Sequence, residues 1–384
     1  MRGIALIVRA GAVVCASAFV FSLLVHGTPR GAVASTEAAT APSRTATAAT
    51  KPSARAKVKK QRATSRVPPG VVAIVATGDI VMGSSPNLPP DGGRTFFSDV
   101  QTDLAGDVVI GNLEGTLSTG GSSKCGEASR SCFAFHTPPS YARRLADAGF
   151  TVMNLANNHA MDYGQHGLDE TLDALEGAGL RYTGRPDQVT VQKVGKIRVA
   201  TVGFAPYPWA ASLTDIAGAK RLVRAADRVA DIVVVTMHAG AEGSDRRHVT
   251  PGTERFLGEN RGDPVRFSHA VVDAGADLVL GSGPHVLRGM EWYKGRLIAY
   301  SLGNFAGYKV FALGGPLSTS AILRVTLDGA GRFETGRIVA TRLVGAGVPA
   351  LDPSESAHGA IRTLSREDFG RHGVRITGDG FVTR

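Results

Sequence analysis

Apolar runs of strand length alternate along the chain with stretches whose apolar residues recur at helical spacing. Residues 150–180 show this most clearly: the apolar run 150–156 stops at Asn157-Asn158-His159, and leucines then follow four and three apart within 168–175. A short, continuous apolar run is typical of a strand buried on both faces, and the leucine spacing is typical of a helix with one buried face. We therefore predict a strand, a polar loop and a helix, with Gly179 directly after the helix.

The same alternation continues through residues 71–344. Strands interspersed with helices in this order predict an α/β protein with helices outside mixed sheets. Residues 346–384 are predicted to form an irregular C-terminal extension with one short helix near 354–364. The pattern also predicts strands within 71–79, 107–114, 231–242 and 276–286, two strands within 189–204, helices over 140–148, 219–229 and 264–274, and hairpins over 292–304 and 322–344.

Side chains of the kinds that bind metal ions follow the ends of five predicted strands. A buried carboxylate or imidazole needs a partner, and one ion beyond the carboxyl ends of the strands could serve several of them. Carboxylate, amide and imidazole ligands together suit Mn, Fe, Zn or Mg rather than a thiolate site. The alternative is a network of hydrogen-bonded polar residues without an ion. The residues are Asp79, Glu114, Asn158 with His159, His238 with Glu242, and His285.

The first 69 residues differ in character from the rest. Residues 1–34 combine Arg2 and Arg9 with an apolar run and a small-residue site ending at Ala34, which indicates a signal peptide, or a membrane anchor if the segment is not cleaved. Residues 35–69 are rich in Ala, Ser, Thr, Pro, Lys and Arg and contain no aromatic residue, which predicts a disordered basic linker. This linker either contacts an anionic membrane or cell-wall surface or is a solvated tether. We therefore expect an exported protein at the cell surface or outside the cell.

The net charge of +10 belongs to this N-terminal part. It holds 11 of the 43 basic and one of the 33 acidic residues, so residues 70–384 carry 32 of each. Nucleic-acid binding requires basic residues gathered on the folded domain. The balanced charge therefore argues against a nucleic-acid partner.

Cys125 and Cys132 enclose a short loop rich in Gly and Ser. In an exported chain a close pair of cysteines is most simply a disulfide that closes a surface loop. Six intervening residues do not match the usual spacing of zinc ligands, which makes a metal role the weaker alternative.

Six ordered motifs between residues 72 and 310 resemble those of the CapA family, bacterial capsule synthesis proteins associated with poly-γ-glutamate. Because they occur in the same order along the chain, chance agreement is a poor explanation. The motifs are GDIVMG (78–83), GNLEG (111–115), NLANNH (154–159) with DYG (162–164), HAGAE (238–242), GSGPHV (281–286) and YSLGNF (300–305).

The resemblance implies a fold and a set of roles. The family is similar to calcineurin-like metallophosphoesterases, which implies a four-layer αββα sandwich with mixed sheets over residues 70–345 and one or two divalent ions, Mn, Fe or Zn. His159 would donate a proton to the leaving group. The implied metal ligands are Asp79, Glu114, Asn158, His238 and His285, and the residues implied to support them or to face the substrate are Asn112, Asn157, Asp162, Glu242 and Asn304.

The chain departs from the pattern at two positions. Val81 replaces a histidine of the phosphoesterases, and Gly283 replaces the first histidine of a His-Pro-His sequence common in CapA-like chains. Two functions remain open. The first is a metal-dependent hydrolase-like protein that acts on an anionic cell-surface polymer, by resemblance poly-γ-glutamate, or on its precursor. The second is a non-catalytic component that binds the polymer or associates with membrane-embedded synthase subunits.

Overall fold

A computed structural model describes residues 70–126 and 132–384, and these belong to one compact unit. The predicted signal peptide or anchor (1–34) and the predicted linker (35–69) lie outside the described residues. Within the two described ranges, none of the helices is both long and apolar enough to cross a bilayer.

Eight strands form the larger sheet, in the order β18-β17-β16-β1-β2-β5-β6, with β15 also paired to β1. Neighbours among β1, β2, β5 and β6 are parallel, whereas β16, β17 and β18 run antiparallel to their neighbours. The carboxyl ends of the parallel strands therefore lie at one edge. The strands are β1 (Val71–Val81), β2 (Val108–Leu113), β5 (Val152–Asn154), β6 (Arg181–Thr183), β15 (Asn304–Gly307), β16 (Thr319–Asp328), β17 (Phe333–Val344) and β18 (Val348–Leu351).

The second sheet has six strands in the order β13-β14-β12-β9-β8-β7. Its four central strands are parallel, and β7 and β13 are antiparallel edge strands. This sheet is also mixed. The strands are β7 (Thr190–Val194), β8 (Ile197–Phe204), β9 (Ile232–His238), β12 (Leu278–Ser282), β13 (Met290–Tyr293) and β14 (Arg296–Ala299).

Short elements complete the described part of the chain. The α-helices are α1 (Ala142–Ala148), α2 (Gly164–Gly177), α3 (Ile216–Val229), α4 (Pro264–Ala274) and α5 (Ser356–Phe369). Two-stranded pairs are β3 (Thr116–Leu117) with β4 (His136–Thr137), β10 (Arg255–Phe256) with β11 (Glu259–Asn260), and β19 (Arg375–Ile376) with β20 (Val382–Thr383). Gly179 has a φ of +78° directly after the Ala178 cap of α2, as its predicted position after the helix requires.

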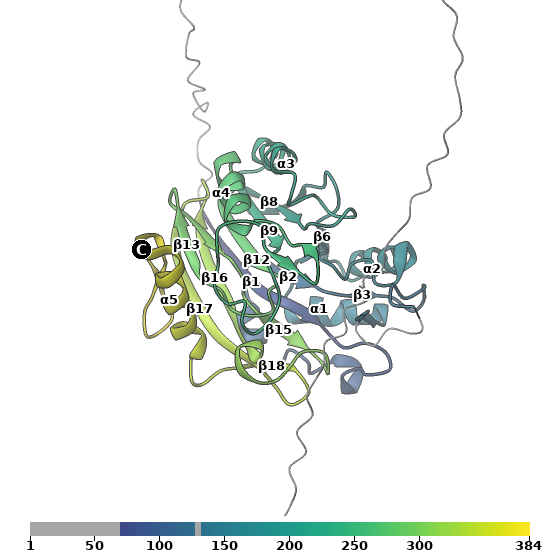
Figure 1. Ribbon diagram of the computed structural model, residues 1–384. Coiled ribbons are helices and arrows are strands. Elements are labelled where there is room, and N and C mark those ends of the chain that lie inside the picture. The colour runs from purple at the N-terminus through teal and green to yellow at the C-terminus, as the bar shows by residue number, and fades with distance from the viewer. Residues whose placement is uncertain (1–69, 127–131) are drawn as a thin grey trace, which may run out of the picture. The chain divides into compact units, whose positions relative to one another are not determined.

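The two sheets pack face to face and helices cover their outer faces (Figure 1). The inner core joins β1 to β9 through residues such as Ile74 and Val234. Leu145 and Leu175 pack α1 and α2 on the outside of the larger sheet, and the residues of a third core pack α3 and α4 on the outside of the smaller one. The predicted αββα sandwich with mixed sheets is confirmed.

The structure corrects two expectations. Residues 346–384 contain the predicted helix as α5 but are not an irregular extension, because β18 joins the larger sheet and α5 buries Ala357 and Ile361 in the inner core. Asn304 does not end the hairpin that begins at β13. That hairpin ends with β14, and Asn304 begins β15, which pairs in parallel with β1 of the other sheet.

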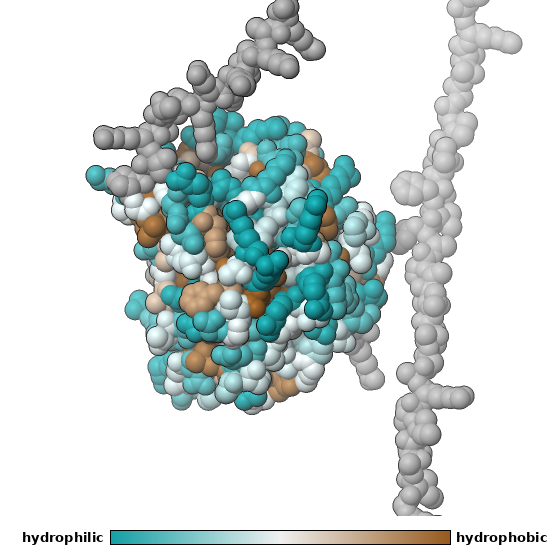
Figure 2. Space-filling view, turned by 90° about the vertical axis from the view of Figure 1, so that its left-hand side faces the viewer, coloured by the Kyte–Doolittle hydropathy of each residue, from teal (hydrophilic) through white to brown (hydrophobic). Residues whose placement is uncertain are grey.

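Figure 2 shows a face on which hydrophilic residues predominate and hydrophobic ones occur in small, separate patches. Scattered apolar residues of this kind are normal on the surface of a folded domain. The polar residues predicted to bind a metal lie at or near strand ends.

Candidate metal centre and adjoining cavity

The predicted ligands gather where parallel strands of both sheets end. Asp79 lies near the end of β1, Glu114 directly follows β2, His238 is the last residue of β9, and His285 follows β12. Because the carboxyl ends of parallel strands meet at one edge, residues far apart in the sequence become neighbours there.

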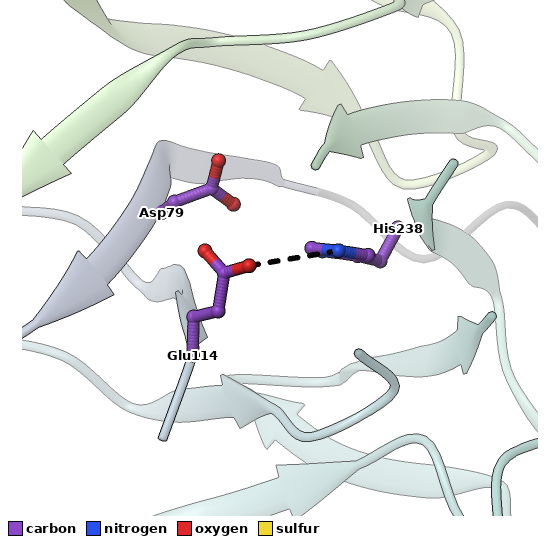
Figure 3. Close-up of side chains that lie close together, drawn as sticks. All are labelled: Asp79, Glu114 and His238. Atoms are coloured by element: carbon purple, nitrogen blue, oxygen red, sulfur yellow. Dashed lines mark ion pairs between the residues drawn. The ribbon is translucent and has the colours of Figure 1, made fainter. Parts of the chain in front are cut away.

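Asp79, Glu114 and His238 form a buried cluster whose potential ligand atoms all lie within 4.8 Å of one another. Their side chains come from three strand ends and point toward a common centre (Figure 3). Glu114 Oε1 lies 3.6 Å from His238 Nε2. Two carboxylates and an imidazole at such separations match the ligand types of a divalent cation.

The surroundings of the Glu114 carboxylate show whether the cluster can hold an ion. Both of its carboxylate oxygens are buried, and neither has a hydrogen-bond partner among the described residues. Burial, and then the charge of Asp79, raise the pKa of Glu114 well above its usual range. A buried carboxylate without hydrogen-bond donors is costly unless cations compensate it, so the residues fit a divalent ion.

His285 adds a second imidazole to the cluster. Its Nδ1 lies 3.2 Å from Asp79 Oδ2 and 2.9 Å from Asn304 Oδ1, and its Nε2 lies 3.8 Å from Glu114 Oε1. Burial by itself would lower the pKa of His285, but the charges of Glu114 and Asp79 and the hydrogen bond to Asp79 raise it well above the usual value. Its φ of +62° is a strained conformation for a non-glycine residue, as is found at functional sites.

Asparagine side chains next to the cluster contact its ligand residues and hold them in place. Asn112 Nδ2 donates to Asp79 Oδ1 at 2.8 Å and lies 3.2 Å from His238 Nδ1. Asn112 Oδ1 accepts from Asn154 Nδ2 at 2.8 Å and from Asn157 Nδ2 at 3.2 Å. These contacts place Asn112 and Asn157 in supporting positions. Asn154 belongs to the same network, although the sequence did not single it out.

His159 forms a pair with Asp162. His159 Nδ1 lies 2.8 Å from Asp162 Oδ2, so the proton on Nδ1 is donated to the carboxylate and Nε2 is left for other contacts. Burial lowers the pKa of His159, and the hydrogen bond to Asp162 opposes that shift. Lys124 Nζ lies 2.6 Å from Asp162 Oδ1, which balances the buried charge of Asp162.

A cavity of about 480 Å³ adjoins the cluster. Its lining includes Lys124, Asn158, His159, Trp209, Glu242 and Arg261. Asn158 Oδ1 is buried without a hydrogen-bond partner among the described residues, so it is available to an ion or a ligand. The disulfide between Cys125 and Cys132, with a Cα–Cα distance of 5.5 Å, lies beside this cavity, and Cys132 contributes to its lining.

Glu242 and Arg261 connect the cavity to the buried cluster. Arg261 Nη1 lies 2.7 Å from Glu242 Oε1, and Arg261 Nη2 lies 3.1 Å from His238 Nε2. Burial would raise the pKa of Glu242, but a hydrogen bond from His285 and the charges of His285 and Arg261 hold it at about 2. Burial and then the charge of Arg261 lower the pKa of His238 well below its usual value.

Sequence reasoning missed Arg261. It follows the short strand β11 in a loop and not a long buried strand, so the strand-end pattern did not mark it. The one available signal was the density of charged residues in GENRGD (258–263).

Comparison with known proteins assigns the family. A family model described as bacterial capsule synthesis protein PGA_cap matches residues 73–309. The chain is 31% identical to the PGA biosynthesis protein CapA of Bacillus subtilis over 69% of this chain and 70% of that protein. It is 36% identical to the capsule biosynthesis protein CapA of Bacillus anthracis over 42% of this chain, and it spans only 41% of that protein's length.

Solved structures include a similar chain, the 5′-nucleotidase precursor of Thermus thermophilus. The similarity has a TM-score of 0.38 and 16% sequence identity, and covers 78% of this chain and 59% of that one. The assignment rests on the sequence matches and not on this comparison. On those matches, the chain belongs to the family of bacterial capsule synthesis proteins.

Proposed function

We propose that this chain is an exported, metal-dependent hydrolase-like protein that acts on an anionic cell-surface polymer or its precursor during capsule synthesis. The observation that carries the proposal is the meeting of two features at one cavity. His159, with its proton-holding partner Asp162, lines the cavity, and Glu242 and Arg261 join the same cavity to the buried carboxylate and imidazole cluster.

The arrangement suits hydrolysis of a phosphoryl or acyl bond. A divalent ion held by Asp79, Glu114 and an imidazole would supply Lewis acidity toward the reacting oxygen. His159 has its Nδ1 tied to Asp162, so Nε2 is the nitrogen that can exchange a proton with a substrate in the cavity. Asn158 Oδ1, which is buried and unpaired among the described residues, would contact the ion or the substrate.

The family and the named relatives support a polymer as the substrate. The relative from Bacillus subtilis is named for PGA biosynthesis and that from Bacillus anthracis for capsule biosynthesis. We propose poly-γ-glutamate or its precursor as the first substrate to test, with membrane-embedded synthase subunits as partners. Residues 1–69 would provide the export signal or anchor and the contact with the membrane or wall.

A second candidate function is a non-catalytic component that binds the polymer. The position of Arg261 favours it, because a guanidinium already engages His238 Nε2, an atom that could otherwise be a metal ligand. In that case the cavity would bind the polymer without cleaving it.

Turnover by the purified protein separates the two candidates. We would measure hydrolysis of bis(p-nitrophenyl) phosphate and of poly-γ-glutamate in the presence of Mn²⁺. His159→Ala is expected to lower turnover about 10²- to 10⁴-fold, because it removes the proton-exchanging imidazole. His166→Ala is the matched control, since His166 is an exposed histidine on α2 outside the cavity lining. Equal rates for the wild type and His159→Ala would refute the hydrolase proposal, and polymer binding without turnover would support the second candidate.

A further inference from the structure

Arg261 brings a fixed positive charge into the buried part of the centre. Its side chain is only 1% exposed, and its guanidinium contacts both His238 and Glu242. A buried guanidinium is stable only where its charge and its donors are matched. The charge of Arg261 must therefore be balanced by the groups of the centre itself.

The guanidinium is held on several sides. Arg261 Nε donates to the carbonyl oxygen of Gly240 at 3.1 Å, and Nη1 donates to the hydroxyl of Tyr207 at 2.8 Å. The backbone adds a pair of contacts, because Gly240 N–H donates to the carbonyl oxygen of Arg261 and Arg261 N–H donates to that of Glu254. Arg261 is thus part of the fold around the centre and not a mobile surface side chain.

Arg261 and a metal ion would compete for one atom. Arg261 Nη2 can only donate, so its contact of 3.1 Å with His238 Nε2 places the in-plane lone pair of the ring on Nε2 and the proton on Nδ1. A metal ion bound to the same nitrogen would lie about 2.0–2.1 Å from it. Both cannot use that lone pair, so Nε2 is open to an ion only if Arg261 moves away.

Gly283 lies against the same atom. A Cβ atom at position 283 would be 3.0 Å from His238 Nε2, and the φ of Gly283 is +106°. Position 283 therefore supplies no side-chain ligand to this half of the centre, and a larger residue would crowd the imidazole. The part of the centre around His238 therefore has no side-chain ligand from position 283 and contains the positive charge of Arg261.

The charges of the buried groups also favour one ion. Asp79, Glu114 and Glu242 bring three carboxylates together. One divalent ion and the guanidinium of Arg261 would neutralise these three carboxylates when His238 and His285 are both neutral, as a metal-bound imidazole is. A second divalent ion would leave an excess of positive charge in a buried site, which is costly.

From these observations we propose that the centre binds a single divalent cation and that Arg261 supplies the second positive charge, beside His238. The ion would be held on the side of Asp79, Glu114 and His285. This inference rests on the metal centre of the proposed function and narrows it, because the substrate would be clamped between one ion and one guanidinium.

The stoichiometry and spin coupling of bound Mn²⁺ test the proposal. The purified full chain would be saturated with Mn²⁺, freed of excess metal, and examined by elemental analysis and electron paramagnetic resonance. We expect one ion per chain with an uncoupled Mn²⁺ signal. Two exchange-coupled ions with Arg261 intact would overturn the inference and leave the proposed hydrolase standing. A folded protein without any ion would remove the metal centre on which both proposals rest.

Variants at Arg261 test its role directly. Arg261→Met removes the charge while keeping an apolar stem, and we expect it to take up a second ion. Arg261→Lys keeps the charge and should still bind one, as should Arg255→Met, which alters an exposed arginine on the same hairpin. If Arg261→Met is folded and binds one ion, the exclusion of a second ion by Arg261 is refuted. If Arg261→Met does not fold, the number of ions bound by the wild type and by Arg261→Lys still shows whether the centre holds one ion or two.

Discussion

Replacing Glu114 by glutamine should change stability in opposite directions with and without metal. In the metal-free protein the Glu114 carboxylate is buried and has no hydrogen-bond partner among the described residues, and its burial and then the charge of Asp79 raise its pKa. The variant Glu114→Gln removes the like charge and provides an N–H group that can donate to Asp79. We expect the free energy of unfolding in excess chelator to increase by about 1–3 kcal/mol, the usual cost of an unsatisfied buried polar group.

With metal present the order should reverse. An ion that binds only the folded state adds about 2.7 kcal/mol when its free concentration is about one hundred times its Kd. The variant lacks one of the two charged ligands and should keep little of this gain. Wild type should therefore be the more stable protein in Mn²⁺ and the less stable one in chelator.

Urea unfolding followed by circular dichroism measures both values. The control is Glu291→Gln, because Glu291 is also buried but accepts hydrogen bonds from His269 and from the hydroxyl of Tyr300. That variant should lose about 1–3 kcal/mol under both conditions. If Glu114→Gln is destabilised by the same amount in chelator and in Mn²⁺, Glu114 is a structural residue and the metal centre is refuted.

Three further predictions concern the rest of the fold. Burial would raise the pKa of Asp352, but hydrogen bonds from Ser356 and Ser354 hold it at about 2, against an ordinary value of 3.8. The ionised Asp352 carboxylate therefore adds to the free energy of unfolding above about pH 4, and this gain is lost as the pH falls through about 2. Asp352→Asn should lower the free energy of unfolding by about 2 kcal/mol near neutral pH and by almost nothing at about pH 2. An equal loss at both pH values would contradict this reasoning. Leu175→Ala, at a fully buried position between α2 and the larger sheet, should cost about 2–5 kcal/mol in urea unfolding, and a cost below about 1 kcal/mol would show that the helix is not packed as described. Cys125→Ser should lower the free energy of unfolding by about 2–3 kcal/mol through loss of the disulfide, whereas added reductant should destabilise the wild type but leave the variant unchanged.

Local patterns in the sequence correctly predicted most of the main elements, although Asn304 does not end the predicted hairpin. Apolar runs and helical spacing depend on neighbours within a few residues, so the range 264–274 and the turn at Gly179 could be predicted without knowing the fold. The expectation that the polar residues at strand ends lie together followed from the shared edge of parallel strands. Asp79, Glu114 and His238 do meet there.

Other features depended on contacts between distant segments. Residues 292–304 read as one hairpin in the sequence, but β15, which begins at Asn304, pairs with β1 in the other sheet because of long-range packing. Likewise, a helix near 354–364 could be predicted locally, but the place of α5 against the inner core is set by contacts with distant strands.

The local pattern along the sequence determined which polar side chains lie near strand ends, because an apolar run and the polar residues that follow it are neighbours in the chain. Only the tertiary structure decided how the charges are matched. Arg261 lies 23 residues after His238 in the chain, and the distance of 3.1 Å between their nitrogens arises from the folding of a loop against a strand end. Electrostatic interaction depends on separation in space, which no local pattern along the chain specifies.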